Sequence, residues 1–388
     1  MSTLVPSTSS AGADTPPEAP RPSGGPLTTT SPASAVSGAD TPSAADTPAY
    51  REVAAERRRG RARRGLVVGA LAALVVVVFA LSLMCGHRFY SPGEVVRVIL
   101  GQDVPGAGFT VGTLRLPRAL LAVVTGLCFG MGGVVFQTML RNPLASPDII
   151  GISSGASAAA VFALVGLSLS GVWLSVSAVV AGLATALAVY LLAYRGGVLG
   201  TRLVLIGIGV ASMLDALTSY VLAGAGQWEL QEATRWLTGS LNGASYTALL
   251  PVLGALLMCG GLLLGAGRNL QMLRLGDDSA AALGVRVEGT RVLVILAAVG
   301  LIAFATAASG PIAFVAFLSG PIAARLVGGG HSLLVPAGLV GAALVLCADF
   351  AGQWLLGTRF PVGVVTGVLG APYLVYLIIR SNRSGGSL

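Results

Sequence analysis

Charged residues are scarce in this chain of 388 residues, because Asp, Glu, Lys and Arg together make up only 10% of it. Hydrophobic residues make up 54%, 54 residues are glycine, and the mean hydropathy is +0.82. A soluble globular protein of this length needs more polar side chains to cover its surface. The composition therefore excludes a soluble globule and indicates a membrane protein.

Lysine is absent altogether, so all 24 basic residues are arginines. A P-loop nucleotide site needs a lysine on the nucleotide phosphates. The chain therefore cannot carry a conventional P-loop ATPase site. Any coupling to ATP has to come from another subunit, and we expect no enzymatic activity from this one.

Cysteine and histidine are few and scattered. The four cysteines lie far apart in apolar runs, without CxxC or Cys/His spacing: Cys85, Cys128, Cys259 and Cys347. We interpret them as small buried hydrophobic side chains, and the isolated His87 and His331 as loop residues. The sequence thus predicts no metal ligands, no cofactor and no catalytic residues.

Residues 1–56 are rich in Ser, Thr, Pro and Ala and have no apolar periodicity, so we expect a disordered cytoplasmic tail. Six arginines follow within residues 57–64, directly before an apolar run at 66–86. Arginines beside a first span hold that end in the cytoplasm. This position makes nucleic-acid binding the weaker interpretation of the basic cluster.

Apolar runs of membrane-spanning length recur along residues 57–380. We predict ten spans, at 66–86, 117–138, 149–169, 171–194, 203–224, 246–267, 290–309, 311–328, 332–356 and 362–380. Ten spans put both termini in the cytoplasm, including a short tail at 381–388. Sixteen arginines then fall at the inner side and six at the outer side, as the positive-inside bias requires. The fold class is an all-α polytopic membrane protein.

The loop 268–291 carries signals for a short helix. Asp277 is a good N-cap, residues 279–283 can form about two helical turns, and Gly284 is a natural helix stop. Such a helix presents a rigid knob between two spans. An ordinary polar loop is the alternative.

Arginines at the outer ends of spans oppose the topological bias and need a reason. Arg115, Arg118 and Arg359 are the members of this set. They are suited to docking an acidic partner surface, or alternatively they extend to lipid phosphates.

Two carboxylates, Asp215 and Asp349, fall inside predicted spans. Such groups usually face a bundle interior or a water-filled cavity. They could relay protons, cap neighbouring half-helices, or pair with an arginine near the membrane edge. Their isolation favours a structural role.

Five motifs in matching order resemble those of the FecCD-type permeases, the transmembrane subunits of ATP-binding-cassette importers for ferric siderophores, haem and cobalamin. They cover about residues 66–380. The motifs are RLPR at 115–118, QTMLRNPLASPDIIGISSGA at 137–156, LGDDSAAALGV at 275–285, GPIAFV at 310–315 and FPVGVVTGVLGAPY at 360–373.

The resemblance implies a function for the knob and for the outer arginines. The knob corresponds to the coupling helix that sits in a cleft of the ATPase subunit. We therefore predict ten coupling residues: Leu275, Gly276, Asp277, Asp278, Ser279, Ala280, Ala281, Ala282, Leu283 and Gly284. The outer arginines correspond to groups that dock a substrate-binding protein. Gln353 replaces the arginine that many members carry a turn after Asp349, which favours Arg115 and Arg118 over Arg359 for docking.

The sequence-based hypothesis is a permease subunit in a bacterial cytoplasmic (inner) membrane, importing an iron chelate, most plausibly a ferric siderophore. Its expected partners are two ATP-binding subunits, a second permease subunit (the same chain or a paralogue), an extracytoplasmic substrate-binding protein and the lipid bilayer, with no nucleic acid. The rival hypothesis is a stand-alone secondary transporter coupled to protons through Asp215 or Asp349. The Gly320-Pro321 pair departs from the Pro-His or Pro-Gln common in the family and alters that span's expected geometry.

Overall fold

The computed structural model describes residues 48–194, 200–328 and 330–383, and within these ranges the chain forms helices and no strand. The chain divides into two compact units, Met1–Val53 and Ala54–Leu388. Most of the predicted tail, residues 1–47, lies outside the described residues. Helix α1 (Pro48–Met84) begins before the predicted end of that tail at residue 56.

Within the described residues, eight helical segments are long and apolar enough to cross a membrane. Three of them are the whole helices α5 (Val172–Ala193), α12 (Val287–Ser309) and α14 (Leu334–Trp354). Three are parts of longer helices: Arg58–Met84 in α1, Arg202–Ala223 in α6 (Gly200–Ala223) and Val362–Ile379 in α15 (Val362–Arg383). The other two are Tyr246–Gly265 and Gly108–Met139, and the latter consists of the π-helical η2 (Gly108–Arg115) followed by α3 (Leu116–Met139). The segment Tyr246–Gly265 consists of α8 (Tyr246–Ala255), a π-helical turn η4 (Leu256–Gly260) and α9 (Gly261–Gly265). The protein is therefore an integral, multi-pass membrane protein, as predicted.

Two further apolar helices, α4 (Ile152–Val165) and α13 (Val315–Val327), correspond to the predicted spans 149–169 and 311–328 but are shorter. A short 3₁₀ turn, η3 (Pro147–Ile150), and Gly151 with φ 83° precede α4. An irregular segment ending at Phe314, with φ 64°, precedes α13. Left-handed backbone conformations of this kind interrupt an α-helix, so hydropathy overestimated both lengths.

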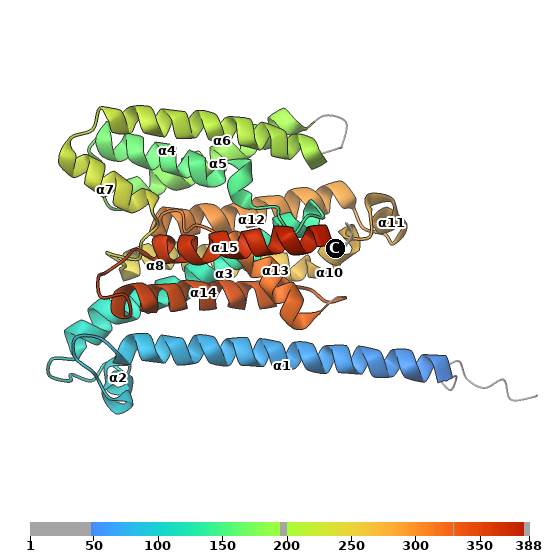
Figure 1. Cartoon of the computed structure of the whole chain (residues 1–388), viewed down its shortest axis with the longest axis horizontal. Helices are drawn as coiled ribbons and strands as arrows, with labels where there is room; N and C mark the ends of the chain where they lie inside the picture. Colours follow the sequence, from blue (N-terminus) through green and yellow to red (C-terminus); the bar gives the residue numbers. More distant parts are fainter. Residues whose placement is uncertain (1–47, 195–199, 329, 384–388) are drawn as a thin grey trace, which may run out of the picture. The chain divides into compact units, whose positions relative to one another are not determined.

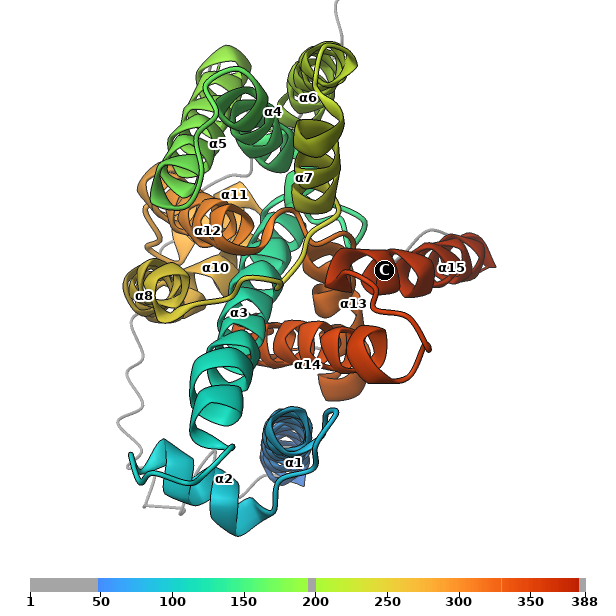
Figure 2. The ribbon, with the colours of Figure 1, turned by 90° about the vertical axis from the view of Figure 1, so that its left-hand side faces the viewer.

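Helix α3 lies at the centre of the helices that surround it. It packs against α12, α13 and α14, and Figure 2 shows it running between α14 on one side and α8 and α12 on the other. A Cβ atom at Gly130 would meet the carbonyl oxygen of Ala337 in α14, and one at Gly133 would meet that of Ala316 in α13. Small residues at these positions let the backbones approach closely, as membrane helix packing requires.

Helices α4, α5 and α6 pack against one another, and α4 and α5 also pack against α12. Figure 1 shows them side by side, joined to α7 (Gln227–Leu237). At the same end as α7 lies α2 (Pro92–Ile99), which begins with a capping box. There the backbone N–H and the hydroxyl of Ser91 donate to Glu94 and hold the pKa of its carboxyl below the usual range.

The cysteines follow the sequence interpretation only in part. Cys128 and Cys259 are buried, Cys85 is half-buried, and all four thiols are free. Cys347 is exposed, which corrects the prediction that every cysteine is buried. Its position on an outward face of α14 explains the difference, since apolar residues at such positions can face lipid or another membrane subunit.

Candidate functional site

The predicted knob is a short helix, α11 (Asp277–Ala282), preceded by α10 (Gly267–Leu273). Gly284 ends it with φ 84°, and its N–H donates to the carbonyl of Ala281 over 2.9 Å. The N–H of Val285 donates to the carbonyl of Ala280 over 3.0 Å, which completes a Schellman motif. The predicted helix and its glycine stop are therefore confirmed.

The start of α11 differs from the sequence prediction. Gly276, with φ 114°, is the N-cap residue, and the side chain of Asp277 makes no capping bond. The prediction of Asp277 as N-cap is wrong because the glycine before it adopts a backbone conformation that other residues avoid, which starts the helix one position earlier. The carboxylate of Asp277 bonds arginine side chains instead of capping the helix.

Asp277 bonds two arginines from two other parts of the chain. Its Oδ1 accepts from Arg141 at 3.0 Å, and its Oδ2 accepts from Arg291 at 2.8 Å. Arg141 follows the end of α3 and has a left-handed backbone (φ 48°), whereas Arg291 lies in the first turns of α12 and is 14% exposed. Sequence reasoning missed this group of three charged side chains. Two features could have indicated it: an arginine directly before the Asn142-Pro143 turn, and another at the start of a span.

The surface of α11 presents apolar and small side chains outward. Leu275 is 65% exposed and Leu283 is 58% exposed, while Ala280 is buried against Leu273 and Val285. The helix is thus anchored by one face and leaves two leucines free to contact a partner. Exposed large apolar side chains on a polar loop are typical of an interaction surface.

Arg115 lies at the opposite end of α3 from α11 (Figure 1). Its guanidinium donates to the carbonyls of Leu83 at 2.7 Å, Met84 at 3.1 Å and Arg88 at 2.9 Å. It therefore satisfies carbonyl groups at the C-terminal end of α1, which have no partner within the helix.

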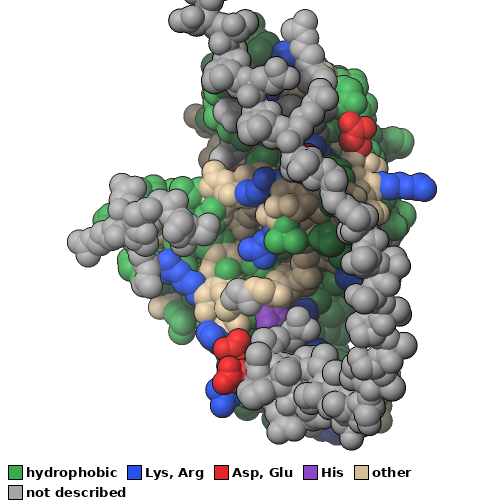
Figure 3. Space-filling model, turned by 90° about the vertical axis from the view of Figure 1, so that its right-hand side faces the viewer, with side chains coloured by type: hydrophobic (Ala, Val, Ile, Leu, Met, Phe, Trp, Pro, Cys, Tyr) green, Lys and Arg blue, Asp and Glu red, His purple; other side chains and the backbone are tan. Residues whose placement is uncertain are grey.

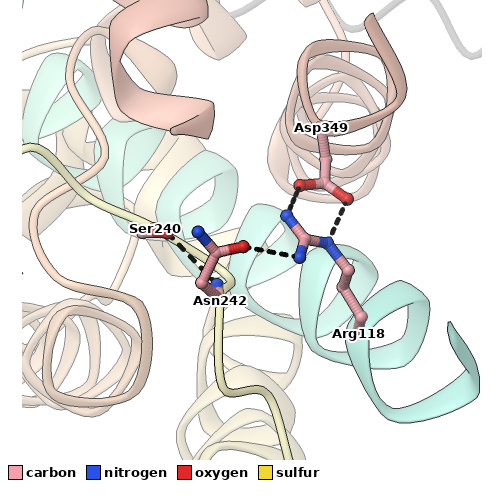
Figure 4. A network of polar contacts seen from close by, with 4 residues as sticks. All are labelled: Arg118, Ser240, Asn242 and Asp349. Atoms are coloured by element: carbon pink, nitrogen blue, oxygen red, sulfur yellow. Dashed lines mark hydrogen bonds and ion pairs between the residues drawn. The ribbon is translucent and has the colours of Figure 1, made fainter. Parts of the chain in front are cut away.

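Arg118, one turn farther along α3, makes a bidentate pair with Asp349 of α14, drawn in Figure 4. The two bonds measure 2.9 Å (Nε to Oδ2) and 2.7 Å (Nη2 to Oδ1), and the side chains are 21% and 10% exposed. A third bond of 2.7 Å joins Arg118 to Asn242, whose N–H donates to Ser240. Of the roles considered for Asp349, the structure shows pairing with an arginine.

Arg359 is exposed and contacts His87, the loop histidine that follows α1. The ring of His87 in turn packs edge-on against Trp354, with centroids 5.5 Å apart. The three predicted docking arginines therefore share one end of the molecule. Arg359 is the more accessible member, and Arg115 and Arg118 are bound to other parts of the chain.

Asp215 lies away from the Arg118 network, in a cleft of about 620 Å³. Residues of α4, α6, α15 and the segment before α13 line it, and the polar members are Ser146, Asp148, Ser153, Ser154, Ser157, Asp215, Thr218 and Ser219. Asp148 accepts from Ser153 at 2.6 Å and from Ser146 at 3.1 Å, whereas Asp215 is exposed. The sequence did not predict this gathering of hydroxyls and carboxylates, because residues 146–157 and residues 215–219 are far apart in the sequence.

No group of three His, Cys, Asp or Glu side chains that could hold a metal ion occurs among the described residues.

Comparison with known proteins identifies this arrangement. Residues 74–380 match the FecCD transport family. The achromobactin transport system permease protein CbrC of Dickeya dadantii (strain 3937) is 40% identical over 314 residues, covering 80% of this chain and 90% of the relative. The ferric enterobactin transport system permease protein FepG of Escherichia coli (strain K12) is 38% identical over 317 residues, covering 81% and 95%.

A solved structure, an inward-facing metal-chelate type ABC transporter, superposes on this chain with a TM-score of 0.73 at 30% identity. It covers 81% of this chain and 99% of the other. The family match spans the membrane helices, the α11 knob and the outer arginines together. The chain is therefore a transport permease that belongs to the FecCD transport family.

Proposed function

We propose that this protein is the transmembrane permease subunit of an ATP-binding-cassette importer that takes up a ferric siderophore. A substrate-binding protein delivers the chelate, and a separate subunit hydrolyses ATP. The observation that carries the proposal is the family match across residues 74–380, with relatives named as achromobactin and ferric enterobactin permeases. The absence of lysine, and so of a P-loop lysine, agrees with ATP hydrolysis elsewhere.

Energy coupling is assigned to residues 275–284 at the inner end. In this proposal α11 inserts into a cleft of the ATPase subunit through Leu275 and Leu283, the exposed leucines beside it. The ion pairs of Asp277 with Arg141 and Arg291 then carry the movement of α11 to α3 and α12. Two ATPase subunits serve two permease chains.

Docking of the binding protein is assigned to the outer end, which carries Arg115, Arg118 and Arg359. Arg359 is free to meet an acidic side chain directly because it is exposed. The guanidinium of Arg118 already bonds Asp349, and that of Arg115 already bonds carbonyls of α1. Each of these two arginines could therefore bond an acidic partner only in addition to its present contacts. We therefore propose that Arg359 makes first contact and that the other two hold the receiving surface in shape.

The passage for the chelate is assigned to the polar cleft at Asp215. An exposed carboxylate at membrane depth is costly against lipid, so water or protein has to cover it. Exposed apolar side chains on α6 and α15, such as Met213, Tyr220 and Val368, flank the same region and suit a second permease chain. The passage would then lie between two permease subunits, with both termini in the cytoplasm.

The experiment is co-purification from the native membrane in mild detergent, followed by reconstitution and iron-chelate uptake. Recovery of a P-loop ATPase with the chain, and uptake that requires ATP, would support the proposal. Uptake by the chain alone that collapses with an uncoupler would favour the proton-coupled alternative. That alternative already has a difficulty, because both carboxylate oxygens of Asp349 bond Arg118.

A further inference from the structure

A cavity of about 530 Å³ lies at the inner end of the protein, beside the C-terminal end of α3. Its walls come from α3, the turn that follows it, the end of α10, α13 and its following loop, and α15. The charged residues that line it are Arg141, Arg274 and Arg325. Among the residues that the structure describes, no carboxylate lines it, so the charged groups on its wall are all positive.

The three guanidinium groups are only partly compensated. Arg325 lies over the rings of Tyr373 and Tyr376, with its guanidinium carbon 5.7 Å and 5.2 Å from their centroids, and donates to the Tyr373 hydroxyl at 3.3 Å. These neutral rings orient the guanidinium without cancelling its charge. Arg141 shares the single carboxylate of Asp277 with Arg291. Arg274 is exposed on the cavity wall.

The rest of the lining is uncharged, with Gln137, Thr138 and Asn142 as its polar members and mainly apolar side chains otherwise. Val134, Leu144, Leu333 and Leu377 contribute hydrocarbon walls. Figure 3 shows basic and hydrophobic side chains lying next to each other on this end of the molecule.

An arginine cluster above an apolar wall matches an anionic group attached to hydrocarbon. Guanidinium groups bond phosphate oxygens in a fork geometry, and basic pockets between membrane helices on the cytoplasmic side bind anionic lipid headgroups. We propose that this cavity is a binding site for the phosphate of an anionic phospholipid of the inner leaflet, with the acyl chains against the hydrocarbon wall formed by Val134, Leu144, Leu333 and Leu377. The site goes beyond the proposed transport function and depends only on membrane residence and orientation.

The test compares lipids on the full chain, purified in mild detergent and stripped of native lipid. Dioleoyl phosphatidylglycerol, dioleoyl phosphatidylcholine and inorganic phosphate are added separately, and bound species are counted by native mass spectrometry. We expect phosphatidylglycerol to be retained in preference to phosphatidylcholine. Arg274→Gln combined with Arg325→Gln should weaken phosphatidylglycerol binding about thirtyfold, at about 1 kcal/mol for each arginine.

The matched control is Arg268→Gln combined with Arg286→Gln. These arginines are exposed in the same inner loops but do not line the cavity, so the change in net charge is identical. An equal loss of binding in the control would overturn the proposal, because general attraction to basic loops would then explain the result. Displacement of phosphatidylglycerol by inorganic phosphate would assign the site to free anions and overturn the lipid assignment.

A second variant covers the case in which the double substitution fails to fold. Ala324→Phe fills the cavity from α13 and leaves every arginine in place. We expect it to abolish selective retention of phosphatidylglycerol. Unchanged retention would show that the lipid binds outside the cavity, which contradicts the proposal.

Discussion

Arg118 and Asp349 are 231 positions apart in the sequence, yet two hydrogen bonds join their side chains near the N-terminal end of α3. Removing one partner of such a half-buried pair leaves the other charge without its compensation. Beyond the C-terminal end of α3, Arg141 has a left-handed backbone, and its side chain reaches Asp277. At the scale of single residues, the arginines of this chain therefore hold helices together as well as marking the topology.

The Arg118–Asp349 pair should show strong coupling in a double-mutant cycle. We expect Arg118→Ala and Asp349→Ala each to lower the free energy of unfolding by about 2–3 kcal/mol, allowing for partial exposure. The double variant should lose much less than the sum. Thermal unfolding in detergent measures this, with the exposed Arg235→Ala as control. Additive losses would show that the pair contributes nothing as a pair.

Gly133→Ala should weaken the packing of α3 against α13, because the new Cβ meets the carbonyl oxygen of Ala316. We expect a loss of about 1–3 kcal/mol in the free energy of unfolding. Gly254→Ala is the matched control, since no atom lies within 4 Å of its Cβ position in α8. That control should be neutral or up to about 1 kcal/mol more stable. Equal effects in the two variants would contradict the close approach of α3 and α13.

At the scale of elements, α11 packs on α10 and α12, and Asp277 adds a link to the end of α3. Because α3 also contacts α13 and α14, it links the α11 region to several spans. The N-terminal end of the same helix carries Arg118 and its partners. Helix α3 therefore connects the proposed coupling surface with the proposed docking surface.

Asp277→Asn should uncouple transport from ATP hydrolysis in the assembled complex. Loss of charge-assisted bonds to two arginines should lower the amount of iron chelate imported per ATP by about tenfold while ATPase assembly persists. Glu288→Gln, an exposed acid in the first turn of α12, removes the same charge without touching the ion pairs of Asp277 and should have no effect.

Substitution of the two arginine partners tests how Asp277 acts. Arg141→Gln and Arg291→Gln should lower the same ratio if the ion pairs transmit movement. If both leave it unchanged while Asp277→Asn does not, the carboxylate acts by contacting the ATPase directly, and the transmission role is wrong.

At the scale of the whole molecule, the polar cleft at Asp215 is separate from the ion-pair networks at the two ends of α3. This separation agrees with the proposal that the solute passes along the Asp215 cleft while α3 connects the two ion-pair networks. It also distinguishes the two transport mechanisms, since only proton coupling requires Asp215 to change its protonation during each cycle.

Asp215→Asn should leave the energy source of transport unchanged. We expect iron-chelate uptake by the variant complex to remain dependent on ATP and to survive an uncoupler, with at most a modest change in rate. Initial rates in vesicles with imposed ATP and proton gradients measure this. Complete loss of uptake in the variant, together with uncoupler sensitivity of the parent protein, would favour the proton-coupled mechanism.

The sequence by itself determined the order of the apolar helices, the α11 knob and the Gly284 stop, because hydropathy and turn chemistry act within a few residues. Of the ten predicted spans, eight are helices of membrane-spanning length among the described residues. The sequence overestimated α4 and α13, whose starts depend on irregular backbone before them. Only the tertiary structure decided that Arg118 bonds Asp349, that Asp277 bonds Arg141 136 positions away, and that three arginines share one cavity. Such contacts join segments whose proximity depends on how all the helices pack, and no local pattern records that.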